Sequence, residues 1–341
     1  MAIKGGVSTS TFGRFPNGRE GKFYTLKNDS LELTLLDYGA SMFSLEVPGR
    51  KGTGNVLLGF DTPEGWSANT IYLNSTVGRF CNRIADASFN LNGKKYTLDA
   101  NDGKNCLHSG RDAFYNRFWD GIIVFEGGDV YVRFELESPD GDGGFPGNVK
   151  AAVTYGLTAE NKVHVLYEAK VDCPCPLSFT NHAYWNLTGV ENSTILKHAV
   201  SLNSSRYLEL DGENIPTGRI LPVEGTPFDF RTPKPVERDM AGCYDHPFII
   251  DKTEDKLMAA VHDPESGRTL KVRGTQPALH FYSGTMIPSV PGREGYLYDK
   301  HSGFCLEPEY YPDSPNHPEY PSAIFTPERP YEEKIIFEFD W

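Results

Sequence analysis

The alternation of hydrophobic and polar residues is the feature that most restricts how this chain can fold. The stretches 130–137, 149–158 and 162–171 (VYVRFELE, VKAAVTYGLT and KVHVLYEAKV) each alternate with a period of two. A period of two turns one face of an extended strand towards a core and the other towards water. Breaks rich in Gly, Asn, Asp and Pro separate the stretches. The pattern therefore predicts antiparallel strands joined by turns.

Turn residues strengthen this prediction. The segment 89–98 (FNLNGKKYTL) places Asn92-Gly93 between two alternating arms, which is a strong β-hairpin signal. The segment 333–341 (EKIIFEFDW) predicts a last strand, while 255–263 fits either a short helix or a strand. The 34 glycines and 24 prolines suit many strands and turns. We expect an all-β protein, a large antiparallel β-sandwich.

The domain organisation follows from what the chain lacks. By length, 341 residues could form two domains, but all-β chains often run this long as one unit. No low-complexity linker or repeat of fixed period occurs. We expect a single domain over residues 1–341. A boundary near residue 175, where CPCPLS interrupts the alternation, is the alternative.

Composition and charge narrow the class of partner. Hydrophobic residues make up 39% of the chain, enough for a sizeable core, and the formal net charge is −13. Nucleic acid and anionic membranes are also negatively charged, so neither is an expected partner. A neutral small molecule is compatible with this charge. We expect a monomer or a weak homodimer.

Cysteine usage and the first residues bear on location. The six cysteines show no C-x-x-C spacing and no dense framework, which predicts reduced thiols. No run of 18 apolar residues occurs, and MAIKGGVSTSTFGRF lacks the apolar segment of a signal peptide. We expect a cytoplasmic protein, although a chain whose signal peptide had been removed would look the same.

The segment 178–189 (SFTNHAYWNLTG) mixes polar and aromatic residues. As an extended chain it has one face with Phe179, Asn181, Ala183, Trp185 and Leu187, and another with Thr180, His182, Tyr184 and Asn186. The second face is polar yet aromatic. Such a surface suits the floor of a cleft for a polar ligand with flat apolar faces, such as a sugar.

A second segment, 303–313 (GFCLEPEYYPD), carries a candidate base. In extended form Glu307 shares its face with Gly303 and Cys305. Small neighbours leave space above a carboxylate, and a base needs that space if substrate is to come within hydrogen-bond reach. The alternative is an edge-strand glutamate in water.

Three further segments carry weaker signals. Asn82 and Arg83 precede the predicted hairpin and offer several donors, although arginines there are usually in surface ion pairs. His108 precedes Ser-Gly in an expected loop, where a structural role is the commoner one. Asp245 lies at the start of an apolar strand, where it could simply cap a turn.

Motifs for metals, nucleotides and serine nucleophiles are absent from the sequence. There is no H-E-x-x-H, no paired C-x-x-C, no P-loop, no G-x-G-x-x-G between strand and helix, and no G-x-S-x-G. The segment 138–148 (SPDGDGGFPGN) lacks the later Glu of a calcium loop and reads as a connecting loop. We expect no metal and no cofactor.

Six segments together resemble one family. They are NRI (82–84), LHSG (107–110), TNHAYWNL (180–187), IPTGRILPVEGTPFDFR (215–231), YDHPF (244–248) and HSGFCLEPEYYPDSPNHPEYP (301–321). In order and spacing they resemble the aldose 1-epimerases, also called galactose mutarotases. The resemblance covers roughly residues 20 to 340.

The resemblance implies a galactose-mutarotase-like β-sandwich with an open cleft. The cleft would bind a free aldose such as galactose or glucose and interconvert its α and β anomers. Glu307 of CLEPE matches the family's catalytic base, and His182 of TNHAYW its catalytic acid. Positions that bind or orient the sugar match Asn82, Arg83, His108 and Asp245.

The chain departs from the family's pattern near these residues. In TQPALHFYSG, His280 stands where members commonly have Gln, and Thr285 replaces the usual Asn after the following Gly. Trp185 replaces a common Phe. We place His280 among the sugar-binding candidates, and its presence leaves the preferred sugar open. Tyr184 shares the side of His182 and is expected to line the cleft.

Anomer exchange sets the chemistry that the two central groups must supply. The ring opens when a proton leaves the C1 hydroxyl and another reaches the ring oxygen. An ionised Glu307 and a protonated His182 on opposite sides of the sugar would suffice. We expect a neighbouring carboxylate to raise the pKa of His182 enough to keep it protonated.

Three other readings remain. An epimerase of the same fold acting on hexose 6-phosphates would want a cluster of Arg or Lys for the phosphate. A non-catalytic sugar-binding module would not need an acid and a base together. A structural sandwich without ligand would leave the polar cleft residues unexplained.

Overall fold

The computed structural model describes residues 6–127, 129–189, 193–240 and 242–341. Residues 1–5, which begin the predicted single domain and the segment read for a signal peptide, lie outside the described part. The ladders between the named strands are all antiparallel. The predicted all-β, antiparallel architecture is confirmed.

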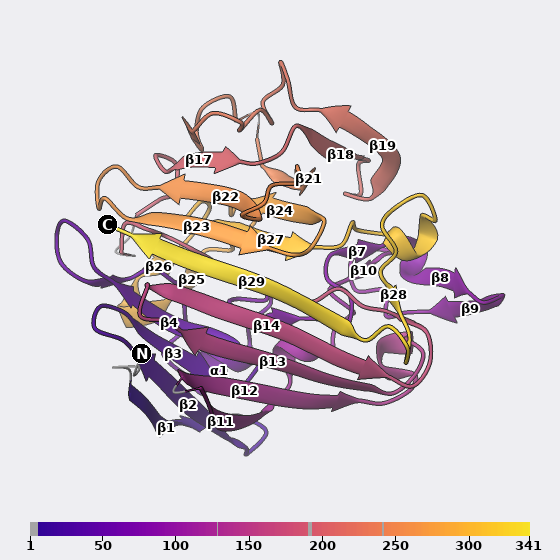
Figure 1. The fold of residues 1–341 in the computed structure, drawn as a ribbon, viewed down its shortest axis with the longest axis horizontal. Coiled ribbons are helices and arrows are strands. Elements are labelled where there is room, and N and C mark those ends of the chain that lie inside the picture. The colour runs from indigo at the N-terminus through magenta and orange to yellow at the C-terminus, as the bar shows by residue number, and fades with distance from the viewer. Residues whose placement is uncertain (1–5, 128, 190–192, 241) are drawn as a thin grey trace.

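A nine-stranded sheet forms the broad layer that faces the viewer in Figure 1. In spatial order its strands are β11 (Asp120–Glu126), β12 (Asp129–Ser138), β13 (Val149–Leu157), β14 (Lys162–Val171), β29 (Tyr331–Asp340), β23 (Thr269–Gly274), β22 (Leu257–His262), β17 (Ala199–Leu202) and β20 (Lys234–Pro235). Burial alternates along β14 and β29 as the sequence pattern predicts. The four alternating segments at 130–137, 149–158, 162–171 and 333–341 are therefore strands of one sheet.

The inner face of this sheet carries the core. Val163, Val165 and Tyr167 of β14 are fully or almost fully buried there. The indole of Trp185 packs on the rings of Phe337 and Phe339 of β29, at centroid distances of 5.0 and 5.7 Å. The segment around residue 185 is thus held against the large sheet, with its other side facing away from it.

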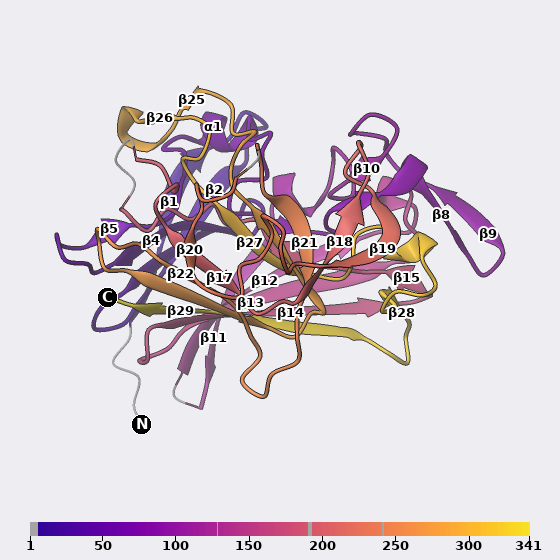
Figure 2. The same cartoon turned by 90° about the horizontal axis from the view of Figure 1, so that it is seen from above.

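Two five-stranded sheets complete the main architecture. The first contains β1 (Gly6–Arg14), β2 (Glu20–Lys27), β3 (Glu32–Leu36), β4 (Ser41–Val47) and β5 (Gly54–Asn55) in that order. The second has the order β19 (Pro216–Pro222), β18 (Arg206–Leu210), β21 (Asp245–Ile249), β24 (Ala278–Tyr282) and β27 (Cys305–Glu309). Figure 2 shows the second sheet on one side of β29 and β14. The large hydrophobic core contains residues of all three sheets.

Short strand pairs and turns fill the space between the sheets. The pairs are β6 (Thr76–Val77) with β16 (Thr180–Asn181), β7 (Arg83–Ile84) with β10 (Cys106–Leu107), β8 (Ser88–Leu91) with β9 (Lys94–Thr97), β15 (Cys175–Pro176) with β28 (Ile324–Phe325), and β25 (Val290–Pro291) with β26 (Leu297–Tyr298). The described residues contain one short α-helix, α1 (Pro63–Ser67), which begins after its N-cap Thr62. The 3-10 turns in the described chain are Ala85–Ala87, Phe114–Asn116, Asp142–Gly144, Arg293–Gly295 and Ser314–Asn316.

Two local predictions are resolved by the structure. The hairpin at 89–98 forms as β8 and β9, with Asn92 and Gly93 at φ of 53° and 78° in its turn. The undecided segment 255–263 is strand β22, which pairs with β17 on one side and β23 on the other. A strand between two partner strands has its backbone N–H and C=O groups hydrogen-bonded on both sides. This explains why the segment forms a strand and not a helix.

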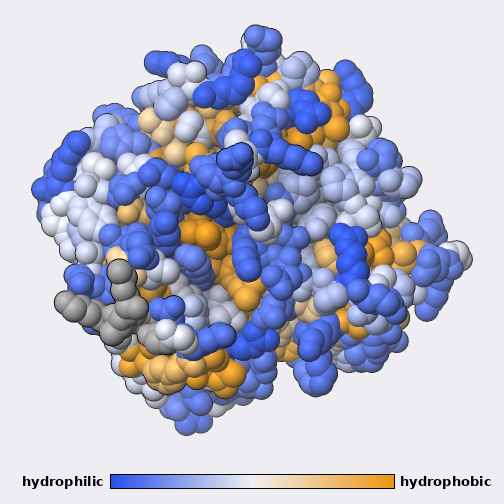
Figure 3. Space-filling model, viewed as in Figure 1, coloured by the Kyte–Doolittle hydropathy of each residue, from blue (hydrophilic) through white to orange (hydrophobic). Residues whose placement is uncertain are grey.

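The surface, the cysteines and the helices can be compared with what the composition predicts. Hydrophilic side chains cover most of the face in Figure 3, with hydrophobic patches between them. All six cysteines are free thiols, as predicted. Among the described residues, no helix is long and apolar enough to cross a membrane.

Candidate active site

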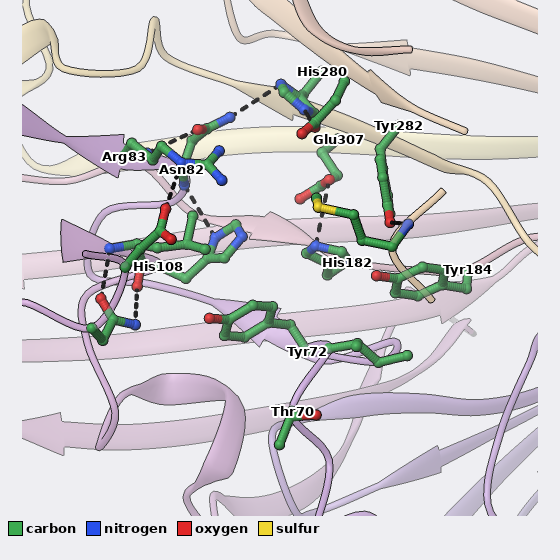
Figure 4. Close-up of a pocket in the computed structure, with 16 residues that line it drawn as sticks. Thr70, Tyr72, Asn82, Arg83, His108, His182, Tyr184, His280, Tyr282 and Glu307 are labelled. Carbon is green, nitrogen blue, oxygen red and sulfur yellow. Dashed lines mark hydrogen bonds and ion pairs between the residues drawn. The ribbon is translucent and has the colours of Figure 1, made fainter. Parts of the chain in front are cut away.

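A cavity of about 330 Å³ lies over strands β21, β24 and β27 of the second five-stranded sheet. This volume is in the range of small-molecule sites. It is lined by Thr70, Ile71, Tyr72, Asn82, Arg83, Asn101, Asp102, Leu107, His108, His182, Tyr184, Asp245, His280, Tyr282, Met286 and Glu307. All eight residues named from the sequence as site candidates are in this set, and Figure 4 shows how seven of them lie.

Backbone pairing fixes His182 in the floor of the cavity. Its N–H donates to the carbonyl of Ser75, and its carbonyl accepts from the N–H of Asn74, both at 3.0 Å. The amide oxygen of Asn74 also accepts from the N–H of Tyr184 at 2.9 Å. Hydrogen bonds thus hold the backbone that carries His182 and Tyr184. The two rings are stacked, with their centroids 5.1 Å apart.

The two predicted faces of the segment 178–189 separate largely as expected. The face without His182 packs into the core through Phe179, Ala183, Trp185 and Leu187. On the other face, His182 and Tyr184 reach the cavity, but Thr180 and Asn186 do not. Asn186 instead donates to the carbonyl of Ser302 at 2.8 Å. The prediction of a polar floor is thus right for two of its four residues, because only 180–181 form a regular ladder here.

Glu307 lies on β27, the last strand of its sheet, yet its side chain is buried at 3% exposure. The alternative of an exposed edge glutamate is wrong. Pairing with β24 sets Glu307 directly opposite His280, and directly opposed residues project from the same face of a sheet. Tertiary contacts around the cavity, rather than the strand's place in the sheet, remove this carboxyl from water.

Glu307 and His182 are adjacent across the cavity floor. His182 Nε2 lies 3.7 Å from Glu307 Oε1, as the dashed line in Figure 4 marks. A pyranose does not fit between groups this close, so the expectation that they stand on opposite sides of the sugar is wrong. The two oxygens that exchange protons in ring opening are both bonded to C1. Two neighbouring proton-transfer groups could therefore reach both oxygens from one side.

Burial determines the charge of this pair. It lowers the pKa of His182 to about 3. Burial also raises the pKa of Glu307 to about 8; the positive charge of His280 opposes this shift, and the charges of Glu309 and Asp245 add to it. The expected ionised Glu307 beside a protonated His182 is thus wrong for the free protein. One proton resides on the pair between these two pKa values, on Glu307 by their order.

His108 has its tautomer set by the neighbouring chain. The backbone N–H of Asn82 donates to His108 Nδ1 at 3.1 Å, and the N–H of His108 donates to the carbonyl of Asn82 at 3.0 Å. Burial lowers the pKa of His108 well below its ordinary value. The ring is neutral, and because Nδ1 accepts, Nε2 carries the hydrogen. His108 therefore offers a donor to the cavity.

This tautomer bears on metal binding. Ligand atoms of His108, His182 and Glu307 lie within 4.8 Å of one another, a set that a transition metal could join. A metal at Nε2 of His108 needs that nitrogen unprotonated and Nδ1 protonated. The N–H of Asn82 points at Nδ1, so the arrangement opposes this tautomer. The described residues are better suited to hydrogen bonding than to a metal.

Left-handed backbone conformations occur at three residues that line the cavity. Tyr72, Asn82 and His108 have φ of 59°, 62° and 52°. Such values in residues other than glycine are strained and are often found at functional sites. The ring of Tyr72 lies 4.4 Å from that of His108 and 5.6 Å from that of His182, measured between centroids. Tyr72 thus forms an aromatic wall beside both histidines.

Charged partners hold two of the remaining candidates. Arg83 Nε donates to Asp102 Oδ2 at 2.8 Å, so the cation is paired at the cavity wall. His280 Nε2 lies 2.6 Å from Asp245 Oδ1. Burial alone would raise the pKa of Asp245, but the hydrogen bond and charge of His280 lower it. Asp245 is therefore an ionised acceptor at the cavity.

Several lining residues were not singled out from the sequence. Tyr282 lies two positions after His280 on the same strand, so strand alternation could have indicated it. Tyr72 and Asp102 carry no comparable signal, because loops deliver them. Strand alternation, which identified Tyr184, does not apply to loops because they have no regular period.

Comparison with protein families gives one match over most of the chain. The family model described as aldose 1-epimerase matches residues 22–338. Among curated relatives, the galactose mutarotase of Rattus norvegicus is 37% identical over 341 aligned positions, covering 98% of each chain. The aldose 1-epimerase of Escherichia coli (strain K12) is 37% identical, covering 95% of this chain and 96% of its own.

A solved structure matches over the same extent. The galactose 1-epimerase from Lactobacillus acidophilus NCFM superposes with a TM-score of 0.86 at 25% identity, covering 99% of each chain. The likeness includes the sheets that carry the cavity as well as the large sheet behind it.

Proposed function

Because the chain belongs to the aldose 1-epimerase family, which are isomerases acting on carbohydrates, we propose that it interconverts the α and β anomers of free aldohexoses such as galactose and glucose. The observation that carries this proposal is the adjacency of Glu307 and His182, 3.7 Å apart on the floor of a monosaccharide-sized cavity. Ring opening needs one group that removes a proton and one that delivers a proton, and this pair can supply both.

The proposed reaction moves two protons while the C1–O5 bond breaks. Glu307 takes the proton of the C1 hydroxyl, and His182 delivers a proton to the ring oxygen, leaving an open-chain aldehyde. Rotation about C1–C2 presents the other carbonyl face, and ring closure returns both protons. The pair begins and ends with one shared proton, so no net proton is consumed.

Sugar binding favours the charge state that this reaction needs. A C1 hydroxyl that donates to Glu307 stabilises its carboxylate, and a ring oxygen that accepts from His182 stabilises its imidazolium. Both contacts draw the shared proton from Glu307 towards His182. The neutral pair is then the resting form, and the charged pair forms with the substrate.

The surrounding groups hold the sugar in our proposal. His108 Nε2–H and the guanidinium of Arg83 donate to hydroxyls, and the carboxylate of Asp245 accepts from them. Tyr184 faces the apolar side of the ring. Asn82 contributes through its contacts with the strand that carries Glu307.

A hexose 6-phosphate is the less favoured substrate. The acidic lining residues are Asp102, Asp245 and Glu307, and Arg83 already pairs with Asp102. A phosphate dianion would therefore meet a site with no unpaired arginine or lysine among its described lining residues.

Polarimetry distinguishes these substrates. Freshly dissolved α-galactose and α-glucose should approach equilibrium faster with enzyme than without, and α-glucose 6-phosphate should not. Acceleration confined to the phosphate would overturn the choice of substrate. Binding of sugar without any acceleration would instead favour the non-catalytic module.

We also propose that residues 1–341 act as one domain and that the protein is a cytoplasmic monomer or weak homodimer. A core that unites residues of all three sheets supports the single domain. Six free thiols suit a reducing compartment. Size-exclusion chromatography with light scattering measures the oligomeric state.

A further inference from the structure

Both ring nitrogens of His280 face protein carboxylates rather than the open cavity. Nε2 lies 2.6 Å from Asp245 Oδ1, and Nδ1 lies 3.6 Å from Glu309 Oε1. The residue is 5% exposed. A ring engaged on both sides has little left to offer a sugar hydroxyl, so its contribution to the site must differ from direct binding.

The strand register explains why these groups meet. β24 lies between β21 and β27, and His280 pairs with Pro247 on one side and with Glu307 on the other. Asp245, Glu307 and Glu309 therefore share the face of His280 as direct or diagonal neighbours. The sheet thus places one imidazole among three carboxyl groups.

Glu309 is the least accessible of these carboxyl groups, at 1% exposure. Asn82 Nδ2 lies 3.3 Å from each of its oxygens, and Cys81 Sγ lies 3.5 Å from Oε2. Among the described residues, His280 is the one basic side chain that pairs with it. A nearby cation stabilises a buried carboxylate, and His280 is the side chain placed to supply one here.

Asn82 is oriented by its own neighbours. Its amide oxygen accepts from the N–H of Arg83 at 2.8 Å, which turns the amide nitrogen towards Glu309. That nitrogen also lies 3.1 Å from His280 Nδ1. If His280 is charged, its Nδ1–H and the amide N–H of Asn82 both face Glu309 as donors. If it is neutral, Nδ1 accepts from Asn82. These two patterns can be told apart by experiment.

We propose that His280 is a positioning residue for the proposed anomer exchange, an imidazolium that bridges Asp245 and Glu309. It holds one oxygen of Asp245, leaving the other for sugar hydroxyls. Its charge also offsets the negative charges that stand beside Glu307. This inference rests on the proposed function for its kinetic consequences, but the charge of His280 can be measured without it.

The proton equilibria agree with this arrangement. Burial alone would lower the pKa of His280, but the hydrogen bonds and charges of Asp245 and Glu309 outweigh it and raise the pKa to about 10. The titratable groups that interact with His280 from the surrounding elements are His108, His182, Cys243, Asp245, His246, Glu307 and Glu309. Of these, Asp245 is hydrogen-bonded to Nε2 at 2.6 Å, and Glu309 forms an ion pair with Nδ1 at 3.6 Å.

Nitrogen-15 NMR of the full-length protein with labelled histidine tests the charge directly. The His280 signals, assigned by their loss in His280→Gln, should show both ring nitrogens protonated throughout pH 5 to 9. One unprotonated nitrogen at pH 7 would overturn the proposal. If His280→Gln folds poorly, His280→Asn supplies the same assignment, and the charge is then read from the wild-type spectrum.

Kinetics tests the effect on Glu307. In His280→Gln a positive charge is lost, so the alkaline limb of kcat/KM should move to higher pH, and KM should rise severalfold as Asp245 loses its partner. In the matched variant Glu309→Gln a negative charge is lost, so the limb should move to lower pH. The double variant should return towards the wild-type limb.

Opposite shifts that cancel are not expected of residues that merely support the fold. Shifts of the same sign, or no shift in either single variant, would overturn the electrostatic role. If wild-type protein does not accelerate mutarotation at all, the proposed function fails, while the NMR result still decides whether His280 is a cation.

Discussion

Replacing the buried carboxyl of Glu307 should stabilise the protein while abolishing its activity. The pKa of Glu307 is about 8 in the folded state, against an ordinary value of 4.5. A carboxyl whose folded pKa is raised costs stability once the unfolded chain ionises, and this cost grows between the two pKa values. The free energy of unfolding falls by about 1.36 kcal/mol per pH unit between the two pKa values. Ionisation of Glu307 in the unfolded chain therefore lowers it by about 1 kcal/mol at pH 5 and about 3 kcal/mol at pH 7.

Glu307→Gln removes this cost because an amide does not ionise. The gap in free energy of unfolding between variant and wild type should widen from pH 5 to pH 7 by about 2 kcal/mol. Urea denaturation at pH 5, 6 and 7 measures it. In parallel, polarimetry should show kcat/KM reduced on the order of 10²- to 10⁴-fold, as expected for loss of a proton-transfer group.

A matched control separates burial from charge. Glu137 on β12 is exposed, and its ion pair with Lys150 joins two exposed side chains. Surface pairs contribute little, so Glu137→Gln should show no gap that widens with pH. A gap for Glu307→Gln that stays constant from pH 5 to 7 would refute the reasoning, because it would mean that Glu307 ionises in the folded protein as it does in the unfolded chain.

Three further predictions concern the site and its support. His182→Asn should lower kcat/KM on the order of 10²- to 10⁴-fold with an unchanged circular dichroism spectrum, and an unfolded product would instead point to a structural role. For the wild type, kcat/KM should fall about tenfold per pH unit above pH 8, where the pair loses its shared proton, after the enzyme-free rate is subtracted; a level profile to pH 10 would contradict this. Trp185→Ala should lower the free energy of unfolding by about 3–5 kcal/mol in urea denaturation, since it empties the contact with β29, and a loss below about 1 kcal/mol would show that the core collapses around the gap.

Strand alternation accounts for most of what could be predicted of the site. It placed Trp185 and Tyr184 on opposite faces, with Tyr184 on the side of His182; in the structure Trp185 lies in the core and Tyr184 lines the cavity. It also gave Glu307 small neighbours on its own face. The rule failed at Thr180 and Asn186, because the chain leaves a regular ladder after residue 181. Tyr72 and Asp102 were missed, since loops without periodicity deliver them.

The sequence by itself determined the class of fold, the paired faces of the strands and, by resemblance, which side chains we expect to carry the chemistry. These depend on local spacing, and local spacing is written in the chain. Only the tertiary structure decided that Glu307 and His182 lie side by side, that burial favours the neutral form of both, and that His280 is enclosed by carboxyl groups. Burial and charge at a point depend on every segment packed around it, and those segments come from distant parts of the chain.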